Sequence, residues 1–189
     1  MKKLVVLVFA LIFSLGTVSS VAADDSKMLQ DNEKKVWEKA CSVIPPERQL
    51  NVDQFKKLYD EVMDGKKKAY LIDVRTHPEF YAFHIPYTDH IHAGHMYTFP
   101  KKIKDKNAMI VVWCRTEKRQ CYVAEKLVEY GYTNVWIYTK GIVGWIQAGY
   151  PVCNEFAGIF KVMEYHKHFT ETDKKTGKPK WQIREFHPY

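Results

Sequence analysis

A cysteine flanked by basic residues stands where a predicted buried strand gives way to a predicted helix. Residues 109–113 form an apolar run with the length and β-branching of a buried strand, and Cys114 follows it directly. Apolar residues then recur at helical spacing, with Gly131 as a stop signal (Val123, Ala124, Leu127 and Val128). The unpaired N–H groups of a helix's first turn and nearby cations favour a thiolate. We therefore predict that Cys114 is a nucleophile, with a buried structural cysteine as the alternative.

The residues after Cys114 suit a negatively charged reactant. Five of them form the expected cradle, in which backbone N–H groups hold negative charge as a nest (Arg115, Thr116, Glu117, Lys118 and Arg119). The basic members would also attract and orient an anionic donor.

The loop Cys-Arg-Thr-Glu-Lys-Arg resembles the active-site loop of the rhodanese-like sulfurtransferases, commonly Cys-x-x-Gly-x-Arg. Two further blocks resemble that family in the same order. The early block is Leu71-Ile72-Asp73-Val74-Arg75, Glu79-Phe80 and His84-Ile85-Pro86. The closing block is Gly131-Tyr132-x-Asn134-Val135, Lys140-Gly141-Ile142, Trp145 and Ala148-Gly149-Tyr150-Pro151-Val152. The resemblance covers residues 67 to 152.

The resemblance implies a rhodanese-like three-layer α/β fold. In such a fold a mainly parallel, roughly five-stranded sheet is flanked by helices, and the alternation of strands and helices in this sequence predicts the same class. Asp73 and Arg75 lie at the exit of a predicted strand over residues 69–74, at the sheet edge where such folds build their sites. The family comparison gives them a bracing role and pairs Arg75 with Glu79.

The resemblance also implies a sulfurtransferase that needs no cofactor. Cys114 would attack the sulfane sulfur of an anionic donor such as thiosulfate, hold it as a persulfide, and pass it to a thiophilic acceptor such as a thiol or cyanide. Related Cys-based phosphatases have a longer loop between Cys and Arg, sized for a phosphoryl group. Here four residues separate Cys114 from Arg119, and the shorter loop favours sulfur transfer.

Two positions near the nucleophile depart from the family pattern. Glu117 stands where the family usually has Gly, which would strain the backbone if that position needs a positive φ. Its carboxylate would also oppose donor anions. Gln120 replaces the common Ser after the loop arginine. Both changes are expected to lower the efficiency of sulfur transfer from thiosulfate.

The sequence divides into four segments. Residues 1–23 are typical of a secretory signal peptide, with Lys2 and Lys3 before an apolar run too short for a membrane span. A helical extension over residues 24–50, the rhodanese-like domain over 51–152 and a C-terminal extension over 153–189 follow. We expect an exported, periplasmic protein with no membrane span after cleavage. The C-terminal extension is rich in aromatic residues, which suggests that it packs on the domain or on a protein partner (Phe156, Phe160, Tyr165, Phe169, Trp181, Phe186 and Tyr189).

The charge and the histidine pattern argue against nucleic-acid binding and against a metal site. The formal charge of +7 becomes +5 once Lys2 and Lys3 are removed, and no nucleic-acid motif accompanies the short basic runs. His90, His92 and His95 could converge on a metal, with residues 90 and 92 on one face if both lie on a strand. No Cys or carboxylate set joins them apart from Asp89, so we predict no metal site.

The four cysteines support a second hypothesis. Cys121 could lie near Cys114 and act as a resolving thiol, which would make the protein a redox or persulfide-relay module. Alternatively, Cys121 is a buried helix residue, and Cys41 and Cys153 form a structural disulfide or stay unpaired. A third hypothesis is a noncatalytic rhodanese-like module that binds a partner.

Overall fold

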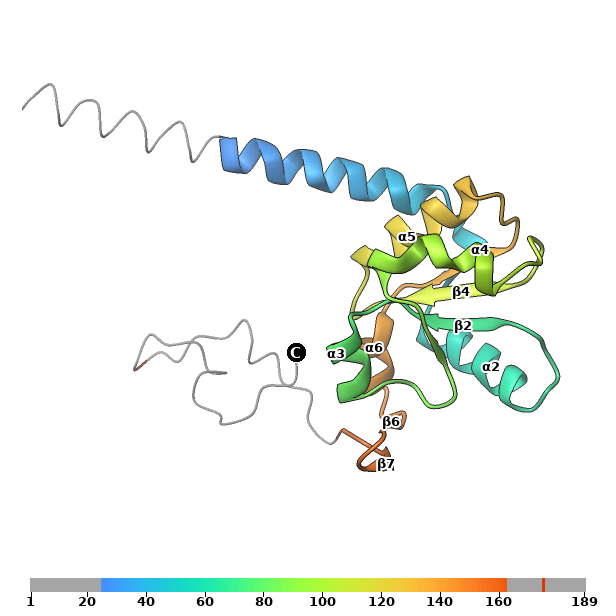
Figure 1. Cartoon of the computed structure of the whole chain (residues 1–189). Helices are drawn as coiled ribbons and strands as arrows, with labels where there is room; N and C mark the ends of the chain where they lie inside the picture. The colour runs from blue at the N-terminus through green and yellow to red at the C-terminus, as the bar shows by residue number, and fades with distance from the viewer. Residues whose placement is uncertain (1–24, 163–174, 176–189) are drawn as a thin grey trace, which may run out of the picture. The chain divides into compact units, whose positions relative to one another are not determined.

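The computed structural model describes residues 25–162 and residue 175 (Figure 1). Residues 25–42 are helical. The chain separates into two compact units, residues 1–39 and 40–189, and the second contains the sheet. The predicted signal peptide and the C-terminal residues 163–174 and 176–189 lie outside the described residues. In the described part, no helix has the length and apolar character needed to cross a membrane.

Five parallel strands form the central sheet, in the order β1-β5-β4-β2-β3. They are β1 (Gln49–Leu50), β2 (Tyr70–Asp73), β3 (Asp89–His90), β4 (Ile110–Trp113) and β5 (Val135–Tyr138). All four residues of β4 are buried, as expected of a parallel strand covered on both faces. The predicted α/β fold with a parallel five-stranded sheet is confirmed. The sheet does begin earlier than the predicted domain boundary, because β1 lies within residues 24–50.

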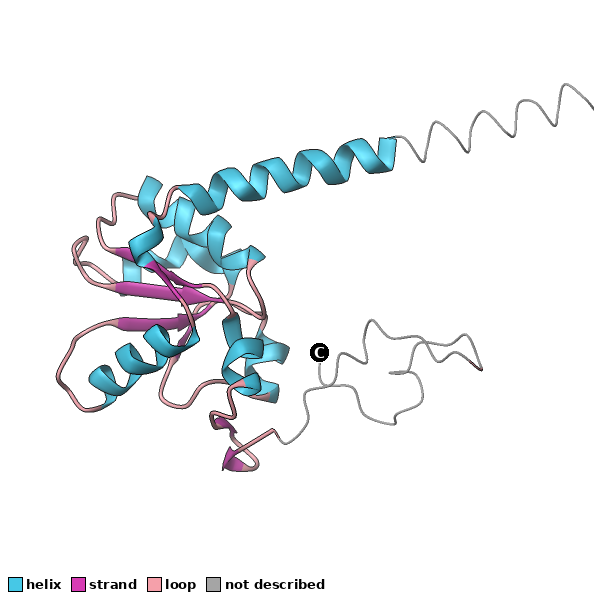
Figure 2. Cartoon of the chain, turned by 180° about the vertical axis from the view of Figure 1, so that it is seen from behind, coloured by secondary structure: helices cyan, strands magenta, loops and turns pink. Residues whose placement is uncertain are grey.

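Helices cover both faces of the sheet (Figures 1 and 2). They are α2 (Val52–Met63), α3 (His77–Ala82), α4 (Phe99–Lys102), α5 (Lys118–Glu129) and α6 (Gly141–Gln147), with two short 3-10 segments, η1 (Pro46–Arg48) and η2 (Ala93–Thr98). In both views α2 lies on one face of the sheet and α5 on the other. The order helix, sheet, helix gives the predicted three layers.

Local signals in the sequence explain where α2 begins. The Asn51 side chain accepts a hydrogen bond from the Gln54 N–H, and the Gln54 side chain accepts one from the Asn51 N–H, each at 2.9 Å. This capping box satisfies two backbone donors that the first turn of a helix leaves unpaired.

An aromatic cluster ties α2 and α6 to the sheet. The Phe55 ring stacks on Tyr138 with centroids 4.2 Å apart and also contacts Trp113 and Trp145, at 5.2 and 5.8 Å. These rings come from α2, β5, β4 and α6, and all four residues are fully buried. Aromatic pairs add to the free energy gained by burying their apolar surface. The cluster therefore fixes the end of β4, where Cys114 follows.

The chain continues past α6 into a hairpin. Strands β6 (Val152–Asn154) and β7 (Gly158–Phe160) pair antiparallel. The backbone of Cys153 also exchanges two hydrogen bonds with His84, at 2.8 and 3.0 Å. The hairpin is thereby attached to the segment between α3 and β3.

Candidate active site

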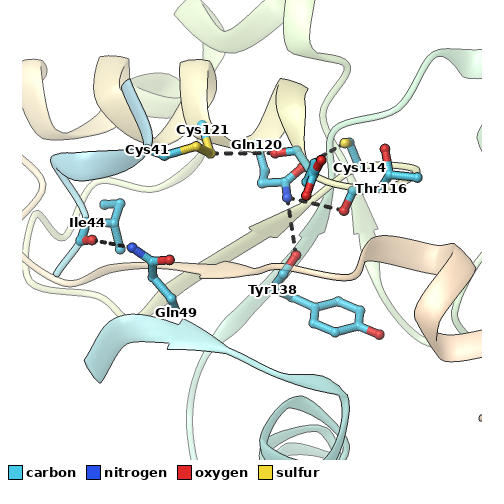
Figure 3. The surroundings of a disulfide bond; sticks show 9 residues. Cys41, Ile44, Gln49, Cys114, Thr116, Gln120, Cys121 and Tyr138 are labelled. Carbon is cyan, nitrogen blue, oxygen red and sulfur yellow. Dashed lines mark hydrogen bonds between the residues drawn. A yellow bond between two sulfur atoms is a disulfide. The ribbon is translucent and has the colours of Figure 1, made fainter. Parts of the chain in front are cut away.

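Cys114 occupies the predicted position between a strand and a helix. It follows the last residue of β4, and α5 begins at Lys118 with Glu117 as its N-cap. Its side chain is buried, with 2 % of the residue exposed. The Cys114 Sγ donates to Gln120 Oε1 at 2.7 Å (Figure 3). The Gln120 Nε2 lies 3.4 Å from the carbonyl oxygens of Thr116 and Tyr138, so the amide links the loop to β5.

Glu117 does not carry the backbone strain that its replacement of Gly suggested. Its φ is −148°, and among the described residues other than glycine only Tyr87 has a positive φ. The loop therefore accommodates a side chain at this position. Thr116, Glu117 and Lys118 are exposed, whereas Arg115 and Arg119 are partly buried.

The N-terminus of α6 holds the start of the Cys114 loop. The N–H groups of Ile142 and Val143 donate to the carbonyl oxygens of Cys114 and Arg115, each at 3.1 Å. Gly141 makes this approach possible. It has a φ of +54°, and a Cβ there would lie 2.6 Å from the Arg115 oxygen and closer still to that of Cys114. Only glycine fits at this point.

An ion pair between α3 and α5 positions the loop arginine. Arg119 Nη1 donates to Glu79 Oε2 at 2.6 Å and Nη2 donates to Oε1 at 2.8 Å. The hydrogen bond with Glu79 raises the pKa of Arg119, and the Cys114 side chain adds to this effect. Arg119 is therefore held by Glu79 and interacts electrostatically with the candidate nucleophile.

Glu79 is ionised because its hydrogen bonds outweigh its burial. Burial alone would raise the pKa of this carboxyl, but donors from Arg119 and Thr76 lower it to about 2. The Thr76 N–H and hydroxyl both donate to Glu79 Oε2, at 3.0 and 2.8 Å. The same carboxylate thus caps α3 and anchors Arg119.

The predicted pairing of Arg75 with Glu79 is wrong. Arg75 instead binds Asp73, with Nε and Nη2 donating to Oδ2 at 2.8 and 2.7 Å, and both residues are buried. Arg75 Nη2 also donates to the Phe83 carbonyl oxygen at 2.7 Å. The physical reason is direction: the Arg75 side chain turns back into the interior beside β2, whereas Glu79 points across to α5. The Asp73–Arg75 pair joins the end of β2 to the segment after α3.

Sequence reasoning missed the contacts of Glu79, Gln120 and Gly141 with the loop. The spacing of Thr76 and Glu79, three residues apart, is a capping-box signal that could have placed this carboxylate at a helix start. No local pattern connected that carboxylate with Arg119.

A family model for the rhodanese-like domain matches residues 54–148, which is half of the chain. The chain belongs to the rhodanese-like domain family. The match contains β2, β4, β5 and the whole loop from Cys114 to Arg119. A comparison with curated proteins finds no match.

Solved structures with the same fold are similar to this rhodanese-like chain at low identity. A thiosulfate sulfurtransferase from Pseudomonas aeruginosa is 18% identical, with a TM-score of 0.50 over 60% of this chain and 22% of that one. A Rhodopseudomonas palustris protein of unknown function, described as a possible tyrosine phosphatase, is 19% identical, with a TM-score of 0.54 over 63% and 92%. The Alr3790 protein from Anabaena sp. is 16% identical, with a TM-score of 0.50 over 57% and 93%.

These similarities establish the fold. The chain spans 22% of the length of the Pseudomonas aeruginosa sulfurtransferase and most of the length of the other two.

The cysteines of this rhodanese-like chain pair differently from both predictions. Cys41 and Cys121 form a disulfide with Cα atoms 4.6 Å apart (Figure 3). Cys114 and Cys153 are free. The proposed Cys114–Cys121 pair and the alternative Cys41–Cys153 bridge are therefore wrong. Successive helical residues point about 100° apart, because a turn of helix holds about 3.6 residues. Gln120 faces Cys114, and Cys121 faces Cys41 instead.

Four histidines of the rhodanese-like domain lie close together beside α3. The His77 ring centroid is 4.8 Å from that of His90 and 5.7 Å from those of His92 and His95. Within residues 25–162, no group of three or more His, Cys, Asp or Glu is arranged to hold a metal ion. Strand β3 ends at His90, so His92 lies beyond the strand and does not share a strand face with His90. Burial chiefly lowers the pKa of His90 and of His92.

Proposed function

We propose that the protein is a sulfurtransferase that carries sulfane sulfur on Cys114. The Cys114 thiolate attacks the outer sulfur of a donor such as thiosulfate, the sulfur–sulfur bond of the donor breaks, and sulfite leaves with the electron pair. The persulfide left on Cys114 is then attacked by a thiophilic acceptor such as cyanide or a thiol, which regenerates the thiolate. Splitting the transfer into two displacements is covalent catalysis and predicts ping-pong kinetics. No cofactor takes part.

The observation that carries this proposal is the pairing of Arg119, at the end of the loop that follows Cys114, with Glu79. A guanidinium held by two hydrogen bonds to a carboxylate keeps a fixed orientation. The Cys114 side chain also interacts with Arg119, so the guanidinium would stabilise a persulfide anion on Cys114 after transfer. The exposed Lys118 and the partly buried Arg115 border the same loop and would attract an anionic donor.

Gln120 supports the same chemistry through its amide. In the thiol form of Cys114, Gln120 Oε1 accepts the Sγ hydrogen. An amide also carries two N–H donors, and rotation about its last bond would present one of them to a thiolate or persulfide. Gln120 is therefore assigned a positioning role beside the nucleophile.

Fold similarity to the Pseudomonas aeruginosa thiosulfate sulfurtransferase supports the class of donor. Because this chain spans 22% of that protein, the donor and acceptor are proposed here on the chemistry of the loop.

We further propose that the protein is exported to an oxidising compartment such as the periplasm. The signal-like residues 1–23 and the Cys41–Cys121 disulfide support this location. A protein partner for the C-terminal extension is a separate proposal, supported by the aromatic residues of that segment.

A noncatalytic binding module is the second candidate function. The observation that favours it is the burial of Cys114, of which 2 % is exposed. In such a module the Cys114–Gln120 contact would be a structural hydrogen bond. A donor could then not reach the sulfur.

Intact mass of the mature protein after incubation with thiosulfate distinguishes these candidates. We expect a gain of one sulfur atom, lost when cyanide is added, and no gain in Cys114→Ala. Cys153→Ala is the matched control and should gain sulfur like the wild type. Absence of uptake by folded protein would overturn the proposal in favour of the binding module. Hydrolysis of p-nitrophenyl phosphate that depends on Cys114 would instead indicate a phosphatase.

A further inference from the structure

Cys153 and His84 face each other outside the Cys114 site. Their backbones exchange two hydrogen bonds as an antiparallel pair, at 2.8 and 3.0 Å. Residues paired in this way place their side chains on the same face of the ladder. The Cys153 Sγ accordingly lies 3.2 Å from His84 Nε2. Cys153 is free and partly exposed, and it lies beyond the residues that match the family model.

The surroundings of His84 fix its orientation and its tautomer. Its Nδ1 lies 2.9 Å from the carbonyl oxygen of Phe80. Because a carbonyl oxygen can only accept a hydrogen bond, Nδ1 must carry the hydrogen, and the neutral ring then has its lone pair on Nε2. The ring also stacks on Phe80, with centroids 3.9 Å apart and planes 10° apart. The basic nitrogen of His84 is thus directed at the Cys153 sulfur.

A nucleophile, a base and a group that orients the base are therefore aligned. This is the arrangement by which a weakly acidic side chain is activated for attack. Burial raises the pKa of Cys153, so at neutral pH most of it is thiol and needs a base to react. His84 supplies that base at hydrogen-bonding distance.

Exposed apolar side chains lie on the hairpin that carries the thiol. Ile159 is the register partner of Cys153 on β7 and is 57 % exposed. Phe156, in the turn between β6 and β7, is 96 % exposed. Exposed apolar surface on the same hairpin as the sulfur suits a reactant that is itself uncharged and apolar.

We propose that Cys153 and His84 form a second reactive site, which exchanges with apolar disulfides. His84 Nε2 takes the proton of Cys153, and the sulfur attacks one sulfur of the disulfide. The disulfide bond of the reactant breaks, a mixed disulfide forms on Cys153, and the leaving thiolate takes the proton from His84. The reaction exchanges one disulfide for another and needs no additional oxidant. An external thiol reverses it in the same way.

The test uses the full mature chain carrying Cys114→Ala, in which Cys153 is the one free thiol while Cys41 and Cys121 stay bridged. The probe is dithiodipyridine, a neutral aromatic disulfide whose released thiopyridone absorbs light. We expect one equivalent to react, with the mixed disulfide mapped to Cys153 by peptide mass. Adding Cys153→Ala should abolish the reaction.

The role of His84 is tested by His84→Gln in the same background, which preserves the backbone bridge. The rate should fall by about tenfold or more, in keeping with the loss of a positioned base. His95→Gln is the matched control, because the ring contacts of His95 are with His77, His92 and Tyr97. Its rate should not change. Equal rates in His84→Gln and its parent would overturn the proposal.

If His84→Gln fails to fold, a second measurement tests the same site with His84 intact. The native Cys114→Ala protein should react faster than the same protein unfolded in denaturant. Burial alone would make the native thiol slower, so a faster native rate requires assistance by the fold. A native rate below the unfolded rate would overturn the proposal.

Discussion

Arg119 on α5 and Glu79 on α3 meet through two parallel hydrogen bonds, although forty residues separate them in the sequence. Glu79 is also the third residue of α3 in its capping box, where the N–H and hydroxyl of the N-cap Thr76 both donate to it. The carboxylate therefore fixes both the helix and the guanidinium beside Cys114. Substitutions at this pair should affect the stability of the fold and the transfer of sulfur together.

Replacing Glu79 with Gln should weaken both the fold and sulfur uptake. Gln preserves the capping box but removes the charge that anchors Arg119. Because the Arg119 side chain is 34 % exposed, we expect a loss of about 1–2 kcal/mol in the free energy of unfolding. Sulfur uptake by Cys114 should slow by about tenfold or more, since the orienting cation is released. Urea unfolding and the rate of the mass shift measure the two effects.

Glu129→Gln is the control for that substitution. Glu129 pairs with Lys126 at 2.8 Å on the exposed side of α5. An exposed pair contributes little, so stability should change by less than about 0.5 kcal/mol and uptake should be unaffected. If the two variants behave alike, the Glu79–Arg119 pair has no special role.

The contribution of Glu79 should disappear at low pH. Its pKa is lowered to about 2, whereas its ordinary value is 4.5. A carboxylate with a lowered pKa in the folded state stabilises the protein above its unfolded pKa and loses this effect as the pH falls through the folded pKa. The stability difference between wild type and Glu79→Gln should therefore be constant above 4.5 and shrink between 4.5 and about 2. Unfolding curves at stepped pH measure it, and a difference that grows on acidification would contradict the assignment.

Gly141→Ala should displace the Cys114 loop. The new Cβ would collide with the carbonyl oxygens of Cys114 and Arg115, in addition to the cost of a φ of +54°. Gly149→Ala separates the two effects, because Gly149 has a φ of +78° and a Cβ added there would meet no atom within 4 Å. We expect Gly149→Ala to cost about 1 kcal/mol and to leave uptake intact. Gly141→Ala should cost more and abolish uptake, and equal effects would show that the close approach is unimportant.

The sequence predicted those features of the fold that depend on neighbouring residues. The apolar run before Cys114 has a local signature, and it forms a strand where one was expected. The Asn51–Gln54 spacing is likewise a local signature, and the structure forms the capping box there. The parallel order of strands follows from their alternation with helices. The position of Cys114 at a strand end was predictable for the same reason.

Features that depend on the direction of side chains were not predictable. Arg75 lies close enough in sequence to pair with Glu79, yet it turns back to Asp73. The Cys41–Cys121 bridge joins residues eighty positions apart, and spacing alone does not select one partner among several cysteines. The strain expected at Glu117 likewise depended on a backbone angle that residue type does not determine.

Loss of the Cys41–Cys121 bridge should destabilise the protein strongly. The bridge closes a loop of eighty residues, so its removal restores chain entropy to the unfolded state. We expect Cys41→Ala with Cys121→Ala to lower the free energy of unfolding by about 4 kcal/mol. Reductant should lower the stability of the wild type similarly and leave the double variant unchanged. A wild type insensitive to reductant would show that the bridge does not contribute.

Gln120→Glu should suppress sulfur transfer without removing the nucleophile. The Gln120 Oε1 lies 2.7 Å from the Cys114 sulfur, so a carboxylate there would face the thiolate directly. Like charges about 4 Å apart repel by about 4 kcal/mol near a protein surface, and about 1.4 kcal/mol already slows a reaction tenfold. We therefore expect uptake from thiosulfate to fall by about tenfold or more, measured as the rate of the mass shift.

Two further variants separate this charge effect from damage to the fold. Gln54→Glu makes the same change at an exposed capping position where Glu serves equally well, and it should leave uptake unchanged. Gln120→Met retains the length of the side chain without a charge and should keep more activity than Gln120→Glu, with thermal unfolding confirming that each variant is folded. If Gln120→Met and Gln120→Glu lose uptake equally, the amide itself is required. The rotation that presents an N–H donor to the persulfide would then account for the loss better than repulsion does.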